Sequence, residues 1–106
     1  MQFVTYTVIG YICLVIRSIR HKGLRLLWED NNPSKLPPAL LKRIKMILEL
    51  MNRAKNIEDM SFPGSDLHKL KGEFAGYWAI RVSGNYRIIF RFIDDEISDI
   101  DYIDYH

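Results

Sequence analysis

The sequence predicts an α+β domain, with two helices in its first half and a small, mostly antiparallel β-sheet in its second. Two observations lead to this prediction. Apolar residues recur at helical spacing between residues 21 and 53, and from residue 77 to residue 92 apolar and polar residues alternate, which is the period of a strand. Helices followed by an antiparallel meander are typical of a sheet that helices cover on one face.

A short strand and a short helix are expected first. Val15 to Ile19 is apolar and rich in β-branched residues, which favours a strand. The spacing of Leu24, Leu27 and Trp28 predicts a helix over His21 to Glu29. The Asn- and Pro-containing stretch after this helix is typical of a loop.

A longer helix is expected to begin at Pro37 and Pro38, because proline is tolerated in the first turn, where backbone N–H groups have no helical partner. Its apolar stripe consists of Leu40, Leu41, Ile44, Ile47, Leu48 and Met51. We expect this stripe to face the core. The basic residues of the same helix are expected to face out: Lys42, Arg43, Lys45 and Arg53.

Two amphipathic strands are expected to form a hairpin from residue 77 to residue 92. Ser83-Gly84-Asn85 predicts the turn, because its glycine or asparagine can take a positive φ. Asp94-Asp95 predicts a second turn, which leads into a last strand from about Glu96 to Ile103. With this alternation, three arginines lie on the sheet face opposite the aromatic core: Arg81, Arg87 and Arg91.

Composition indicates one domain without a disulfide framework. The chain has 106 residues, of which 48% are apolar and 26% charged, and its single cysteine, Cys13, excludes internal disulfides. Residues 1–14 form an uncharged extension that lacks both the basic start of a secretory signal and the length of a membrane span. The extension is either an extended arm or a start-site artefact ahead of a true start near Val15. We expect a cytoplasmic protein without membrane contact.

The charge is distributed unevenly along the chain. Residues 17–93 hold 15 basic and 7 acidic side chains, a balance of +8, whereas residues 94–106 hold six acids and no Lys or Arg. A basic body attracts phosphate-rich partners. The alternative is an ordinary surface whose charges pair internally. The residues that we expect to contact RNA are Arg81, Arg91, Lys42, Arg43 and Lys45.

Several side chains are suited to phosphate and proton chemistry. The sequence has no P-loop, dinucleotide fingerprint or His-rich metal spacing, so neither a metal nor a cofactor is expected. Cleaving RNA without a metal needs a base for the 2′-OH proton, a cation for the charge on the phosphorane, and an acid for the 5′-oxygen. Histidine suits the proton roles, and Lys or Arg suits the charge. The candidates are His21, His68, Lys71, Arg81, Arg87, Tyr105 and His106.

Four motifs follow one another along the chain: Ile16 to Leu24, Leu67 to Gly72, Gly76 to Phe90, and Asp104 to His106. In this order and at this spacing they resemble the HigB-type toxins of the RelE superfamily. The resemblance covers residues 15–106 and implies a RelE-like toxin domain there. It further implies the toxin of a type II toxin–antitoxin pair, an endoribonuclease that cleaves mRNA in the ribosomal A site. The partner it implies is an antitoxin with a helix-turn-helix DNA-binding domain.

The resemblance also implies site residues. His68 and Lys71 match the loop that supplies a histidine and a lysine, and Arg87 matches the arginine that faces the scissile phosphate. The catalytic residues implied are therefore His68, Lys71, Arg87, Asp104, Tyr105 and His106. Either His106 or His68 is the base, Tyr105 contacts the substrate, Lys71 and Arg87 stabilise the phosphorane, and Asp104 orients a histidine.

Structural interpretations stand beside these roles. His21 is interpreted as a helix-start residue, and Arg87 could instead pair with Asp99 or Asp101 across the sheet. The alternative function is a non-catalytic module that binds RNA or the ribosome, or a degenerate relative. Because the basic helices offer a separate face, we expect the antitoxin to leave His68 and His106 uncovered.

Overall fold

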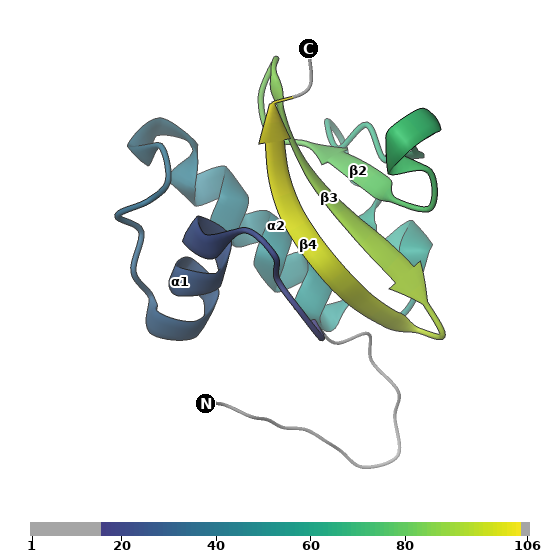
Figure 1. Ribbon diagram of the computed structural model, residues 1–106, viewed down its shortest axis with the longest axis horizontal. Coiled ribbons are helices and arrows are strands. Elements are labelled where there is room, and N and C mark those ends of the chain that lie inside the picture. The colour runs from purple at the N-terminus through teal and green to yellow at the C-terminus, as the bar shows by residue number, and fades with distance from the viewer. Residues whose placement is uncertain (1–15, 105–106) are drawn as a thin grey trace.

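The computed structural model describes residues 16–104, which form two helices and a four-stranded antiparallel sheet (Figure 1). The helices are α1 (Lys22–Asp30) and α2 (Leu41–Arg53). The strands are β1 (His68–Lys69), β2 (Trp78–Arg81), β3 (Tyr86–Ile93) and β4 (Glu96–Asp104), in the spatial order β1-β2-β3-β4. The predicted α+β class is confirmed. The expected N-terminal arm, together with Val15, Tyr105 and His106, lies outside the described residues.

Both helices form close to where the sequence predicts them. His21 caps α1, because its Nδ1 accepts a hydrogen bond from the Leu24 N–H at 3.2 Å, and Asn31 ends the helix with a φ of 53°. Pro38 does not begin the longer helix itself. It begins a separate 3₁₀ turn, η1 (Pro38–Leu40), and α2 follows from Leu41.

The prediction of a regular first strand is wrong for the described residues 16–19. Ile16 and Ile19 form only isolated parallel bridges, to Ile97 and Ile100 of β4. Asp99 lies between these two partners with a φ of 53°, which interrupts the extended backbone that a continuous ladder needs. The Ser18 hydroxyl accepts a hydrogen bond from the Asp99 N–H at 2.8 Å and so bridges the interruption.

The two hairpin turns differ from each other. Asp94 and Asp95 have φ angles of 53° and 64°, as a two-residue hairpin turn of type I′ requires. The turn at 82–85 is longer, and neither Gly84 nor Asn85 takes the expected positive φ. Side chains hold this turn instead: the Arg87 guanidinium donates to its carbonyls, and the Ser83 hydroxyl accepts from the Tyr86 N–H at 3.3 Å.

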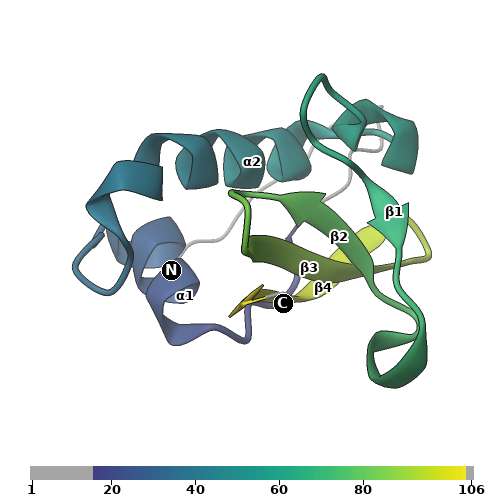
Figure 2. The same cartoon turned by 90° about the horizontal axis from the view of Figure 1, so that it is seen from above.

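The sheet has a core on each face. In Figure 2, α2 lies over one face and α1 lies beside it, and the main core joins both helices to the sheet through residues such as Leu24, Ile44, Ile88 and Phe90. The opposite face carries a smaller cluster of Leu70, Tyr77, Ala79 and Ile89. Among residues 16–104, no helix is long and apolar enough to cross a membrane.

Candidate functional site

One end of the sheet gathers side chains from all four strands. His68 pairs with Ala79, Arg81 pairs with Arg87, and Arg87 pairs with Ile103. Because side chains alternate along a strand, His68, Arg81 and Arg87 lie on the face opposite the helices. Asp104 ends β4 as the partner of Tyr86, so its side chain lies on the helix-covered face, opposite that of Arg87. His68, Arg81 and Arg87 therefore share one face at this end of the sheet, and Asp104 lies at the same end on the other face.

His68 is positioned by a backbone carbonyl. Its Nδ1 lies 2.7 Å from the Asp66 carbonyl oxygen, and since a carbonyl only accepts, Nδ1 carries a proton. In the neutral ring Nε2 then holds the lone pair and can accept a proton. Asp66 itself has a φ of 49°, and its carboxylate lies 4.0 Å from Arg81 Nη2. Asp66 thus links His68 to Arg81.

Arg87 is a buried, fixed cation. The residue is only 6% exposed. Its Nη1 donates hydrogen bonds to three backbone carbonyls: Ser83 at 2.9 Å, Tyr86 at 3.1 Å and Gly84 at 3.4 Å. These bonds hold the guanidinium beneath the β2–β3 turn. The ion pair to Asp99 on this side of the sheet is made by Arg91, at 4.0 Å.

Lys71 follows β1 and is exposed. The next residue, Gly72, has a φ of 71°, which turns the chain sharply into the 3₁₀ turn η3 (Gly72–Phe74). Within residues 16–104 the Lys71 ammonium has no hydrogen bond and no ion pair. It can therefore reach an anion in the solvent in front of the sheet.

The residues expected to contact RNA divide into two groups. Arg81 and Arg91 lie on the sheet face that carries His68, where the Arg91 guanidinium lies 5.4 Å from the centre of the Tyr77 ring. Lys42 and Lys45 are exposed on α2, on the other side of the sheet. The described part of the chain therefore presents two basic surfaces.

Arg43 is half-buried and bonded to the protein, whereas the sequence predicts a purely solvent-facing side chain. Its guanidinium donates to the Arg81 carbonyl at 2.9 Å and to the Gly64 carbonyl at 2.9 Å, and it lies over the Phe62 ring. The Arg81 carbonyl stands at the end of β2, and the Gly64 carbonyl lies in the loop before β1. Arg43 therefore ties α2 to the end of the sheet that carries the candidate site.

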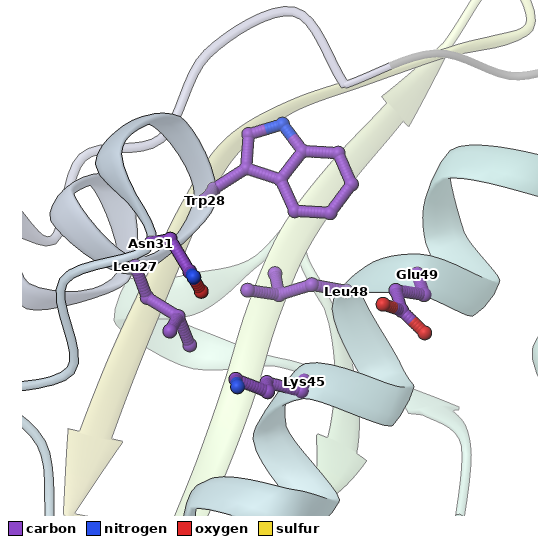
Figure 3. A pocket seen from close by; sticks show the side chains of 6 residues that line it. All are labelled: Leu27, Trp28, Asn31, Lys45, Leu48 and Glu49. Carbon is purple, nitrogen blue, oxygen red and sulfur yellow. The ribbon is translucent and has the colours of Figure 1, made fainter.

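A hollow of about 320 Å³ lies in the helical layer, between α1 and α2. Figure 3 shows its lining: Leu27, Trp28, Asn31, Lys45, Leu48 and Glu49. None of these residues belongs to the sheet face that carries His68 and Arg87. In the part of the chain that the structure describes, no three His, Cys, Asp or Glu side chains are grouped as a metal site would need.

Comparison with known proteins identifies the family. The sequence profile of the HigB-like toxins, RelE-like toxins of type II toxin–antitoxin systems, matches residues 17–106. The chain belongs to the HigB-like toxins. Endoribonuclease HigB of Proteus vulgaris is 39% identical over 92 residues, which cover 87% of this chain and 100% of that protein. Toxin HigB-1 of Vibrio cholerae serotype O1 is 30% identical over 77 residues, which cover 71% of this chain and 81% of the relative.

Solved structures share the fold of this HigB-like toxin. The YoeB–YefM toxin–antitoxin complex of Staphylococcus aureus contains a chain that matches with a TM-score of 0.55 and 20% identity, over 90% of this chain and 99% of that one. YafQ from E. coli strain BL21(DE3) matches with a TM-score of 0.52 and 14% identity, over 86% of this chain and 92% of that one. At these identities the likeness concerns the fold.

Sequence reasoning missed the contacts that position the site of this HigB-like toxin. The partner of His68 is a backbone carbonyl, that of residue 66, and no side-chain motif marks it. The partners of Arg87 and Arg43 are carbonyls as well. The sequence gives only a weak indication of the positive φ at residue 66, namely that aspartate tolerates this conformation better than most residues do.

Proposed function

We propose that this protein is the endoribonuclease toxin of a type II toxin–antitoxin module and cleaves mRNA in the ribosomal A site, in the cytoplasm. The observation that carries the proposal is the placement of His68, Arg81 and Arg87 on one face at one end of the sheet, in a chain 39% identical to Endoribonuclease HigB. Its partner is an antitoxin with a helix-turn-helix DNA-binding domain.

The reaction is attack of a ribose 2′-oxygen on the adjacent phosphorus. A base takes the 2′-OH proton, the bond to the 5′-oxygen breaks, and an acid protonates that oxygen, which leaves a 2′,3′-cyclic phosphate and a 5′-hydroxyl. His68 is the base, since its Nε2 is the acceptor when Nδ1 donates to the Asp66 carbonyl. His106 is the acid, Tyr105 contacts the substrate, and Asp104 orients a histidine. No step requires a metal or a cofactor.

Two cations act on the phosphorane in different ways. Arg87 is held beneath the β2–β3 turn, so its charge is fixed before the substrate arrives. Lys71 is exposed and contacts a non-bridging phosphate oxygen directly. Arg81 and Arg91 bind the RNA backbone on the same face, whereas Lys42 and Lys45 contact RNA from the helical surface.

Cleavage by purified protein on mRNA-programmed ribosomes tests this function. We expect His68→Ala to lower the cleavage rate by about 100-fold or more, the usual range for loss of a general base. Lys71→Ala is expected to lower it as well, because it removes a charge that stabilises the transition state. Lys35→Ala, an exposed lysine between the two helices, is the matched control and should cleave at the wild-type rate.

The RNA ends distinguish the two candidate functions. An active nuclease produces new 5′-hydroxyl ends that His106→Ala and Lys71→Ala abolish or reduce. A wild-type protein that binds programmed ribosomes and produces no new ends would instead be the non-catalytic binding module. Cleavage that is unchanged in His68→Ala, Lys71→Ala and His106→Ala would contradict the assigned residues.

A further inference from the structure

Three aromatic rings lie in contact behind the candidate site. The rings of Tyr86 and Tyr102 are stacked, with centres 5.0 Å apart and planes 8° from parallel. The edge of the pair is closed by His21, whose ring centre is 5.5 Å from that of Tyr102 at an interplanar angle of 79°. Both geometries are favoured for aromatic pairs. All three residues are partly buried beside the main core.

The rings are anchored at their far end by α1. His21 Nδ1 accepts the Leu24 N–H, so the imidazole is fixed as the cap of the helix. Gly23 packs on the same ring: a Cβ at this position would lie only 3.0 Å from His21 Cε1. The orientation of the His21 ring is therefore determined by the start of α1, and Tyr102 packs against a ring that does not rotate freely.

The other end of the stack reaches the site through the sheet. Tyr86 immediately precedes Arg87, and Tyr102 lies two residues before Asp104. In the register of β3 and β4, Tyr86 pairs with Asp104 and Ile88 pairs with Tyr102. The stack thus bridges the two strands diagonally at the last described pair of the β3–β4 ladder, on the face opposite Arg87.

Tyr86 and Asp104 form the last pair of the β3–β4 ladder within residues 16–104. The ring of Tyr102, fixed between Tyr86 and His21, holds this end of the ladder from the helix-covered face. The Tyr102 hydroxyl is buried and makes no hydrogen bond within residues 16–104. Tyr102 therefore contacts Tyr86 and His21 through its ring, and its hydroxyl takes no part.

We infer that Tyr102 is a positioning residue of the nuclease, which through its stack on Tyr86 and its contact with His21 holds the end of β4 beside Arg87. The inference rests on the proposed function in one respect, namely that Asp104 and the residues after it take part in cleavage. Tyr102 itself does not contact the substrate. Its effect passes through the position of Asp104.

The test compares Tyr102→Phe with Tyr102→Leu. Phenylalanine keeps the stack and removes only the hydroxyl, whereas leucine keeps apolar volume and loses the ring pair. We expect Tyr102→Leu to lower kcat at least tenfold with KM within threefold of wild type, at a temperature where circular dichroism shows it folded. Tyr102→Phe should restore kcat to within twofold. Equal kcat in the leucine variant and the wild type would overturn the inference, as would a change in KM alone.

Amide hydrogen exchange gives a readout that does not depend on activity. We expect exchange at Arg87 and Ile103, the last hydrogen-bonded pair of the described β3–β4 ladder, to be at least tenfold faster in Tyr102→Leu and unchanged in Tyr102→Phe. If the wild type cleaves no RNA, the proposed function fails while this measurement still decides the positioning role. Unchanged exchange in the leucine variant would refute it.

A second variant covers the case in which Tyr102→Leu does not fold. His21→Asn retains a side chain that caps α1 but removes the ring that contacts Tyr102. Faster exchange at Ile103 in this variant supports the inference, and exchange equal to that of the wild type contradicts it.

Discussion

His21 and His68 show how one residue type acquires opposite chemistry from its neighbours. At His68 the Nδ1 donates to a carbonyl, so Nε2 is the acceptor. At His21 the Nδ1 accepts from a backbone N–H, so the neutral ring carries its proton on Nε2. The first arrangement leaves a basic nitrogen available for a proton, and the second uses the basic nitrogen to cap a helix. Of these two histidines, His68 has the arrangement that the general base of the proposed reaction needs.

Stability should depend on pH through His21. Burial lowers the pKa of His21, and the nearby Asp101 opposes this effect only in part. The unfolded chain then takes up a proton on this ring at higher pH than the folded one does, so the stabilisation is complete above about pH 6.5 and is lost as pH falls. We expect the Tm of the wild type to fall from pH 7.5 to pH 5.0.

His21→Asn is the matched control for this prediction. Asparagine caps the helix without titrating, so the Tm of this variant should fall less over the same pH range, as thermal unfolding followed by circular dichroism can measure. Both proteins have the same carboxylates, so the effect of their titration on Tm cancels when the two pH profiles are subtracted. Parallel pH profiles of the two proteins would show that His21 is not the group responsible.

Among the elements, α2 and β2 are coupled by Arg43. Its guanidinium donates to two carbonyls. One belongs to Arg81 at the end of β2, and the other belongs to Gly64 in the loop before β1. Hydrogen bonds from a charged donor contribute more than neutral ones, although partial exposure reduces the gain. The same contacts set the approach of α2 to the end of the sheet that carries the candidate site.

Arg43→Ala should lower the free energy of unfolding by about 1–2 kcal/mol, because two carbonyls lose a charged donor. Lys42→Ala removes a neighbouring exposed charge of the same helix and should change it by less than about 0.5 kcal/mol. Urea unfolding of both variants measures the difference. Equal effects would show that Arg43 belongs to the solvated face that the sequence suggested.

Regular periodicity determined which elements could be predicted. Both helices and the β2–β3–β4 meander follow from spacing, because each buries one face. β1 has only two residues, too few for an alternating pattern, and it forms because β2 offers an edge. The parallel bridges at Ile16 and Ile19 depend on a partner some 80 residues away, which no local pattern reports. The motif residues could be identified, but the carbonyls that orient His68 and Arg87 could not.

The whole molecule presents two unlike sides. The sheet face holds His68 and Arg87, and the helical layer holds Lys42, Lys45 and the hollow beside Trp28. An inhibitor that binds the helical layer would leave the candidate site open, and one that binds the sheet face would block it. The charge of α2 favours the first arrangement for an antitoxin with an acidic surface.

Hydrogen exchange of the toxin–antitoxin complex tests this arrangement. We expect antitoxin binding to slow exchange in α1 and α2 and to leave residues 66–71 unchanged. Free toxin under the same conditions is the reference. Protection centred on His68 and on the end of β4 would show instead that the antitoxin covers the candidate site.

The bridges between residues 16–19 and β4 have a consequence for the time at which the protein becomes active. β4 is the last of the described elements to leave the ribosome during synthesis, and it must arrive before Ile16, Ser18 and Ile19 find their partners. Such long-range closure is slow compared with helix formation. A nascent chain that lacks β4 also lacks Asp104. A chain therefore completes its fold and gains Asp104 in the same step, and a product that stops before β4 has neither.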